Sequence, residues 1–266
     1  MSNILDKILA RKAEEVAESK NRRPLTEVKA AMTDAPAPRS LRRSLEQTPG
    51  GVISEFKRRS PSKDWIKRDA RPEDIIPTYE AAGAAALSIL TDHDFFGGSL
   101  ADVVTARPLT SLPILRKEFI IDPYQIYEAR AAGADAILLI AAAIGAARCH
   151  ELAAVAKDAG LEVLLEIHSA EELEAYSPNV DVLGVNNRDL KVFRTDPEQS
   201  IRLFDQLPAG PLPISESGLL DPAVARRVLS AGYRGILVGE AFMKHDVPGD
   251  ALKAYLNCLL NPADEA

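Results

Sequence analysis

The first part of the chain carries apolar residues at helical spacing. Between Ile4 and Val16, apolar side chains recur every three or four residues with charged residues between them, which places them on one face of a helix. A polar stretch at residues 21–49 follows and contains Pro36-Ala37-Pro38, where a regular helix is disfavoured. We therefore predict that residues 1–48 form a helical extension in front of the main repeat.

From Gly51 onward, short apolar runs alternate with segments that are compatible with helices. The runs occur at residues 52–57, 86–90, 113–117, 136–140, 163–166, 182–186, 213–216 and 235–239. Apolar strands that alternate with helices are typical of a parallel sheet that is covered on both faces. The pattern predicts an α/β protein built from repeated β/α units.

Glycines mark the connections between these units. Ala-Gly pairs end four of the helical segments, with the glycines at Gly83, Gly133, Gly160 and Gly232, and glycine readily takes the left-handed conformation that ends a helix. The repeated units, and the lack of a Gly-x-Gly-x-x-Gly motif after the first strand, favour a closed barrel over an open doubly wound sheet. The length of 266 residues suits a (β/α)8 TIM barrel, which needs about 250 residues. We predict this barrel at residues 49–266, forming a single structural domain together with the extension.

Composition and charge narrow the classes of function. Hydrophobic residues make up 46% of the chain and charged residues 27%, as in ordinary globular proteins. The net charge of -7 disfavours long-range attraction to nucleic acid or to an anionic membrane. The N-terminus lacks a signal-peptide pattern, and the apolar stretch at 136–147 is shorter than the roughly 20 residues that span a bilayer. We predict a cytoplasmic protein that binds neither nucleic acid nor membranes.

The cysteines and histidines do not indicate a disulfide framework or a metal site. The two cysteines, Cys149 and Cys258, lack the number and spacing of a zinc cluster, and nothing near Cys149 indicates a reactive thiolate. The four histidines include no pair with metal-ligand spacing on one element. We expect a non-catalytic role for His168 and no bound metal.

Charged residues gather at the carboxyl ends of the predicted strands, where barrels of this type carry their active sites. They are Glu55, Lys57, Lys117, Glu166 and Glu216. Alternation along the first strand places Glu55 and Lys57 on one face. Any one of these residues alone is more often a surface group, but several buried charges have to be paired or used. Opposed charges of this kind shift one another's pKa and can supply both an acid and a base.

Small residues follow the last two strands. Ser217-Gly218 and Gly239-Glu240 occupy the loops in which barrels often bind a phosphate through backbone N–H groups. Small residues also form ordinary tight turns, but the two pairs together favour a phosphorylated small-molecule substrate.

Two further loops allow more than one interpretation. Residues 57–63 are strongly basic in an acidic protein. They could be a solvated charge run, which we expect for Arg58 and Arg59, or a flap that attracts an anionic molecule. Phe95 and Phe96 precede two glycines and could either line an aromatic pocket or pack at the barrel rim.

Six segments resemble, in the same order along the chain, motifs of the indole-3-glycerol-phosphate synthase family. They are residues 54–62, 113–122, 165–168, 184–190, 215–218 and 237–240, and the resemblance covers roughly residues 4–260. The chain departs from the family pattern at Glu118, where Asp is more usual, and at Asp64-Trp65, where a Gly is more typical.

The resemblance implies a cofactor-free carboxy-lyase of tryptophan biosynthesis whose N-terminal helix caps the barrel mouth. Its reaction converts 1-(o-carboxyphenylamino)-1-deoxyribulose 5-phosphate to indole-3-glycerol phosphate and releases CO2 and water. Lys117 is implied as the acid for ring closure. Lys57 and Glu166 are implied as acid and base for dehydration, with their division of labour open. Glu55 and Glu216 are implied to orient the lysines and hydroxyl groups.

The resemblance also implies how the substrate is bound. Asn186 would hold a hydroxyl group or help to place the acid, and Arg188 suits an oxyanion because its guanidinium can donate two hydrogen bonds. The implied substrate-binding residues are Ser60, Phe119, Arg188, Ser217, Gly218, Gly239 and Glu240. The expected partner is this phosphorylated small molecule, and association with other enzymes of the pathway is left open.

Two rival interpretations compete with this function. A different phosphate-binding barrel enzyme could be a sugar-phosphate isomerase or a Schiff-base aldolase, and the aldolase would use Lys117 or Lys57 as a nucleophile. The paired lysines and the N-terminal extension argue against such a different barrel enzyme. A non-catalytic ligand-binding barrel is disfavoured because the full set of strand-end charges is present.

Overall fold

Eight parallel strands close into a barrel in the computed structural model, which describes residues 4–61, 63–189 and 194–261. The strands follow one another around the barrel in chain order, and the last pairs with the first. They are β1 (Val52–Phe56), β4 (Ala86–Leu90), β5 (Ile114–Lys117), β6 (Ala136–Ile140), β7 (Glu162–Ile167), β8 (Val182–Asn186), β9 (Leu212–Glu216) and β10 (Gly235–Val238). The predicted barrel is confirmed, and the predicted strands agree with the observed ones to within one residue at each end.

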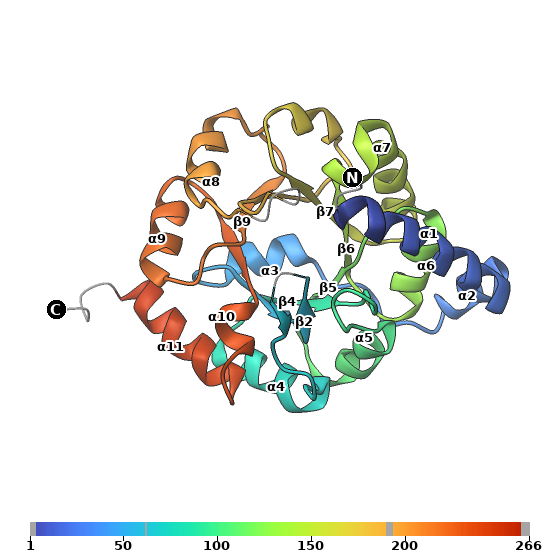
Figure 1. Cartoon of the computed structure of the whole chain (residues 1–266), viewed down its shortest axis with the longest axis horizontal. Coiled ribbons are helices and arrows are strands. Elements are labelled where there is room, and N and C mark those ends of the chain that lie inside the picture. The colour runs from blue at the N-terminus through green and yellow to red at the C-terminus, as the bar shows by residue number, and fades with distance from the viewer. Residues whose placement is uncertain (1–3, 62, 190–193, 262–266) are drawn as a thin grey trace.

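Helices surround the strands, as Figure 1 shows. They are α4 (Pro72–Ala82), α5 (Leu100–Ala106), α6 (Pro123–Ala131), α7 (Ala141–Asp158), α8 (Glu198–Leu203), α9 (Pro222–Ser230), α10 (Glu240–Met243) and α11 (Pro248–Leu260), with the 3-10 helices η1 (Arg107–Leu109), η2 (Glu171–Ala175) and η3 (Phe204–Gln206). The link from β7 to β8 carries only η2. The four glycines predicted to end helices all have positive φ, so those predictions are confirmed.

The strands are buried because they pack on both faces. All strand residues of the barrel are buried except Lys117, Glu162 and Pro213. One apolar cluster fills the barrel interior and includes Ile53 and Leu164. A second cluster fills the space between the strands and the helices. Near-continuous apolar runs are the sequence signature of this arrangement.

The apolar stretch at residues 136–147 divides between β6 and the start of α7. Gly145, with φ of 73°, interrupts α7 near its beginning. None of the helices in the described ranges combines the length and the apolar character that crossing a membrane requires.

The N-terminal extension contains three helices rather than one. The predicted amphipathic helix is α1 (Ile4–Arg22), and Pro36 to Pro38 are non-helical as predicted. Two short helices, α2 (Leu25–Ala31) and α3 (Leu41–Gln47), were not anticipated. Each has only seven residues, and helices of this length depend on tertiary packing more than on local propensity.

The helices of the extension lie at different parts of the barrel. In Figure 1, α1 and α2 lie on the side of α6. Helix α3 instead packs Leu41 and Leu45 into the cluster inside the barrel, and the Ser40 hydroxyl donates to Glu162 at the start of β7. Helix α3 therefore closes the amino-terminal end of the barrel. A boundary after residue 48 remains a prediction, and it would separate α3 from the core that α3 completes.

Candidate active site

A cavity of about 270 Å³ opens at the carboxyl ends of the strands. Its floor carries the predicted strand-end charges, which are Glu55, Lys57, Lys117, Glu166 and Glu216. Phe96 and Phe119 line one wall, and Ile4, Leu5 and Ile8 of α1 contribute apolar side chains. Helix α1 therefore lies at the barrel mouth.

Lys117, the last residue of β5, is at the centre of the charged floor. Its ammonium lies 2.9 Å from Oε2 of Glu166 on β7 and 3.1 Å from Oε2 of Glu216 on β9. Burial opposes the charge on Lys117, but the carboxylates outweigh it, and the pKa of the ammonium is raised. Lys117 is therefore held as a proton-carrying group inside the barrel.

The two carboxylates beside Lys117 differ in their protonation. Burial works against the charge on Glu166, but Lys117, His168 and a 2.9 Å hydrogen bond from Asn186 outweigh it, and the pKa of Glu166 is lowered. Burial dominates at Glu216, Glu166 adds repulsion, and the pKa of Glu216 is raised despite Lys117. One ammonium thus keeps one neighbour ionised while the other neighbour can hold a proton.

A second charge pair lies on β1 and beyond its end. The Lys57 ammonium is 2.6 Å from Oε1 of Glu55, and both residues line the cavity as strand alternation predicted. Gly239 makes room for this pair, because a Cβ built on it would lie 2.5 Å from Oε1 of Glu55. Gly239 therefore has a steric role besides the predicted phosphate contact.

The loop after β9 adopts an unusual backbone conformation. Ser217 and Gly218 both have positive φ, at 66° and 75°, and a Cβ on Gly218 would collide with Thr195 and Pro197. Non-glycine residues at positive φ cost free energy and tend to be kept at functional sites. Both residues line the cavity, as expected for a substrate-binding turn.

The loop after β1 folds over towards the end of β10. It forms a small hairpin of β2 (Arg59–Ser60) and β3 (Asp64–Trp65), and its Lys63 pairs at 2.6 Å with Glu240, the first residue of α10. Asp64 has φ of 57°, so the position where a Gly is more typical keeps a left-handed conformation. Ser60 is buried in the hairpin and is not a lining residue of the cavity. Ser62 lies outside the described residues.

The contacts of Arg58 differ from what was expected for this loop. It was expected to be solvated, but its guanidinium donates to both carboxylate oxygens of Asp102 and, at 2.8 Å, to the Ala70 carbonyl. Arg59 is more exposed and pairs with Asp64 at 2.8 Å. The basic run therefore combines a residue that anchors the loop with one at its surface.

Two aromatic side chains line the cavity. Phe96 lies in the cavity wall, and its ring centroid is 6.0 Å from that of Phe119. Of the two interpretations of the Phe95-Phe96 loop, pocket lining therefore holds for Phe96. Ser99, at the end of the same loop, caps α5 by accepting a hydrogen bond from Ala101.

Arg188 and Asn186 follow β8 and face the same cavity. The Arg188 backbone N–H donates to Asn186 Oδ1 at 3.0 Å, and the Arg188 Nε donates to Thr195 at 3.4 Å. Leu190, the last residue of the predicted motif here, lies outside the described residues. The predicted site residues are thus brought to one cavity with the exception of Ser60.

The sequence matches the family model described as indole-3-glycerol phosphate synthase over residues 5–254. The chain belongs to this family. An indole-3-glycerol phosphate synthase of Bacteroides thetaiotaomicron is 53% identical over 259 residues, which cover 97% of this chain and 100% of that protein. One of Aromatoleum aromaticum is 44% identical over 259 residues, which cover 96% of this chain and 99% of that protein.

Solved structures of other enzymes share the barrel. A thiamine phosphate pyrophosphorylase from Pyrococcus furiosus matches with a TM-score of 0.60 at 18% identity, over 84% of this chain and all of the other. A mutant tryptophan synthase alpha-subunit from the same organism matches with a TM-score of 0.60 at 17% identity, over 80% of this chain and 98% of the other. At such identities the likeness shows the fold alone.

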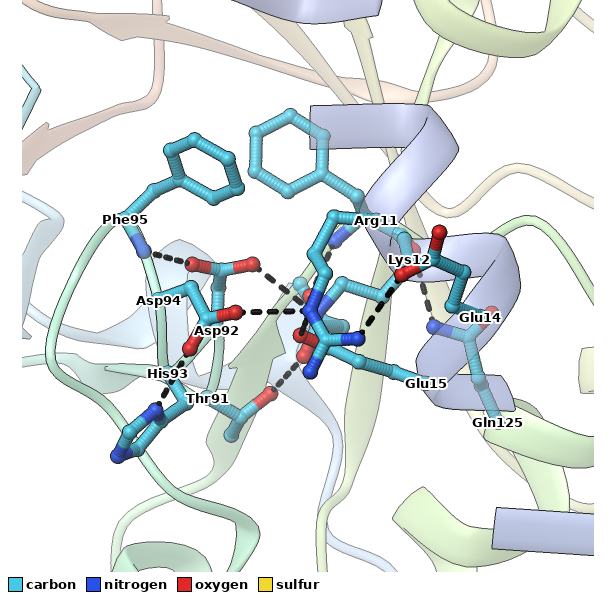
Figure 2. Close-up of polar contacts among 12 residues, drawn as sticks. Arg11, Lys12, Glu14, Glu15, Thr91, Asp92, His93, Asp94, Phe95 and Gln125 are labelled. Atoms are coloured by element: carbon cyan, nitrogen blue, oxygen red, sulfur yellow. Dashed lines mark hydrogen bonds and ion pairs between the residues drawn. The ribbon is translucent and has the colours of Figure 1, made fainter. Parts of the chain in front are cut away.

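In this member of the indole-3-glycerol phosphate synthase family, the extension adds a buried charge that the strand-end pattern did not reveal. Lys12 of α1 is only 3% exposed, and its ammonium lies 3.0 Å from a carboxylate oxygen of Asp92 and 3.0 Å from one of Glu118. Figure 2 shows Lys12 beside Asp92. A signal was present in the sequence, because Lys12 lies midway between Ile8 and Val16 on the apolar face. A lysine there has to find buried partners.

His168 and Cys149 were both expected to have no catalytic role. Nε2 of His168 lies 3.4 Å from Oε1 of Glu166, and its Nδ1 lies 3.4 Å from Glu172. Burial opposes the imidazolium, but Glu172 and Glu166 outweigh it, and the pKa of His168 is raised. Burial raises the pKa of the Cys149 thiol to about 12, which fits an unreactive thiol. The role of His168 stays a prediction.

The described residues contain no cluster of three or more His, Cys, Asp or Glu side chains that could hold a metal ion.

Proposed function

We propose that the protein converts 1-(o-carboxyphenylamino)-1-deoxyribulose 5-phosphate to indole-3-glycerol phosphate, and so acts as a carboxy-lyase in tryptophan biosynthesis. One observation carries the proposal. The Lys117 ammonium is held between an ionised Glu166 and a protonatable Glu216, in a cavity that Phe96, Phe119 and the Ser217-Gly218 turn also line. Family membership and full-length relatives with this name support it.

Ring closure needs an acid on the ketone oxygen while the aromatic carbon that bears the carboxylate attacks the ketone carbon. Lys117 is the proposed acid because its ammonium is buried in the cavity floor. After it donates, it must regain a proton, and Glu216 at 3.1 Å can supply one. Loss of CO2 then restores the aromatic ring. A positioned acid of this kind typically contributes about 10²–10⁴-fold to the rate.

Dehydration needs an acid for the departing hydroxide and a base for the departing proton. We assign the base to Glu166, whose lowered pKa keeps it ionised near neutral pH. Lys57 is the proposed acid, and Glu55 at 2.6 Å orients its ammonium. Asn186 holds the Glu166 carboxylate at 2.9 Å and would also contact a substrate hydroxyl group.

The two ends of the substrate are anionic, and the cavity offers different groups for each. We propose that Ser217, Gly218, Gly239 and Glu240 hold the phosphate, mainly through backbone N–H groups. The Glu240 carboxylate is itself paired with Lys63, which reduces its repulsion of the phosphate. Arg188 would bind an oxyanion, and Phe119 would pack on the substrate ring. Ser60 would act on the substrate only through the hairpin, since it is buried away from the cavity.

The proposal is tested by following indole absorbance and fluorescence during incubation with the substrate in metal-free buffer containing EDTA. Product formation by the unmodified protein, together with its loss in Lys117→Met, would support the proposal. A folded protein that binds the substrate but forms no product would reject it. Borohydride trapping with substrate then tests the aldolase alternative, which requires a covalent lysine adduct. The cytoplasmic location expected from the sequence stays a prediction.

A further inference from the structure

The barrel mouth contains a buried ammonium that the proposed chemistry does not use. Lys12 is on the apolar face of α1, next to Ile8 and Val16 along that face. Its Nζ lies 3.0 Å from Oδ2 of Asp92 and 3.0 Å from Oε1 of Glu118, and it also contacts Glu15 of its own helix at 2.5 Å. Figure 2 shows Lys12 and Arg11 of α1 reaching towards the loop that contains Asp92 and Asp94.

Each barrel carboxylate that Lys12 meets also fixes the backbone of an aromatic residue. Asp92 accepts hydrogen bonds from the N–H groups of Phe95 at 2.8 Å and Phe96 at 3.3 Å. Glu118 accepts one from the N–H group of Phe119 at 2.8 Å. The positions of these two loops are therefore set by the two carboxylates.

These loops and α1 form one side of the cavity. Phe96 and Phe119 line it with ring centroids 6.0 Å apart, and Ile4, Leu5 and Ile8 line it from α1. Lys12 is the charge that joins the three segments, since Asp92, Glu118 and α1 all meet at its ammonium.

Removing the ammonium would leave Asp92 and Glu118 close together with too little positive charge between them. Thr91 donates to Oε2 of Glu118 at 2.7 Å, and Arg116 lies 3.8 Å from the same oxygen, but both contacts are to Glu118 and leave Asp92 without a compensating charge. Buried carboxylates that lose their partner are strongly destabilised and move apart or take up a proton. Lys117 has separate partners in Glu166 and Glu216, so the catalytic floor would be affected much less than the aromatic wall.

We propose that Lys12 is a positioning residue that assembles the aromatic wall of the cavity by holding Asp92, Glu118 and α1 at one point. The inference rests on the proposed function, because it assigns the Phe96–Phe119 wall to the aromatic ring of the substrate. Lys12 touches no reacting atom and acts through the two loops.

The test replaces Lys12 by Met, which keeps the length of the side chain and removes its charge. The expected result is a KM raised about tenfold with kcat within about twofold of the unmodified protein, since uniform binding is lost and transition-state contacts are not. Lys20→Met is the matched control. Lys20 is on the same helix and pairs with Asp122 at 2.7 Å, but it is 47% exposed, and exposed pairs contribute little. Neither constant should change in the control.

Hydrogen exchange supplies a readout that does not depend on turnover. The amides of Phe95, Phe96 and Phe119 should exchange faster in Lys12→Met than in Lys20→Met, because their acceptors are Asp92 and Glu118. If the unmodified protein makes no product, the proposed function fails, and this comparison still decides whether Lys12 orders the loops.

Two results would overturn the inference. One is an unchanged KM in folded Lys12→Met, and the other is unchanged exchange at these amides. If Lys12→Met does not fold, Glu118→Gln decides, because it weakens the same junction while Lys12 keeps Asp92 and Glu15. A raised KM in Glu118→Gln supports the inference, and an unchanged KM rejects it.

Discussion

The carboxylate of Glu216 on β9 lies directly against the α-carbon of Gly184 on the neighbouring strand β8. A Cβ built on Gly184 would collide with Oε1 of Glu216. Oε2 of Glu216 points the other way, to the Lys117 ammonium at 3.1 Å. The position of the Glu216 carboxylate therefore depends on the absence of a side chain at Gly184.

Gly184→Ala should therefore lower kcat by about 10²-fold, because a shift of about 1 Å at a catalytic group has effects of this size. The cost in stability from overpacking should be about 1–3 kcal/mol. Steady-state kinetics and urea unfolding measure the two effects. Shortening the neighbour in Gly184→Ala/Glu216→Asp should recover part of the lost kcat. Unchanged kcat in the single variant would show that Glu216 tolerates displacement.

Lys117→Met should abolish turnover while leaving substrate binding largely intact. The side chain keeps its bulk, but the acid is gone and the Glu166 and Glu216 carboxylates lose their shared partner. The variant should consequently have a lower Tm at pH 8 than at pH 5, since two adjacent buried carboxylates are tolerated better when one is protonated. Product formation and calorimetric binding measure the first effect. Turnover like that of the unmodified protein would exclude Lys117 as the essential acid.

The raised pKa of Glu216 predicts that the stability of the protein depends on pH. Its pKa is raised from the usual value of about 4.3 to about 7 in the folded protein, mainly by burial. The folded state therefore binds more protons than the unfolded state in this window, and stability falls as pH rises through it. Glu216→Gln should remove this contribution, so that the fall in the free energy of unfolding between pH 5 and pH 8 is smaller by about 1 kcal/mol or more. Urea unfolding at pH 5 and pH 8 measures it, and equal slopes in both proteins would contradict the assignment.

Arg188→Ala should act mainly on substrate binding. Arg188 lines the cavity beside Asn186, and it donates hydrogen bonds to Asn186 and Thr195. Loss of a charge-assisted contact to an oxyanion corresponds to about 1.5–3 kcal/mol, or roughly 10- to 100-fold in KM. An unchanged KM in a variant with the same Tm as the unmodified protein would reject the role.

Leu45→Ala tests the closure of the other end of the barrel. Leu45 is 2% exposed and belongs to the cluster inside the barrel, so truncation should lower the free energy of unfolding by about 2–5 kcal/mol. Because α3 is remote from the cavity, KM should not change. Leu25→Ala is the control, since Leu25 is in the same extension but 40% exposed. A raised KM in Leu45→Ala with normal stability would contradict the separation of the two ends.

Local patterns explain how much of this molecule could be predicted. Each strand of a parallel barrel is buried on both faces, so it is an apolar run, and four of the helical segments that return to the strands end at a glycine. The active site lies where those strands end, so Lys117, Glu166 and Glu216 could be found without knowing which strands adjoin. The strand alternation that joins Glu55 to Lys57 is equally local.

The sequence by itself determined the barrel, the strand-end charges and the six family motifs, because each depends on residues close together in the chain. The tertiary structure decided where distant charges meet. Arg58 turned out to anchor its loop on Asp102, Lys12 to join two loops of the barrel, and α3 to close the end opposite the cavity. These outcomes depend on burial and on partners supplied by other elements, and a buried charge is stable only where such partners exist.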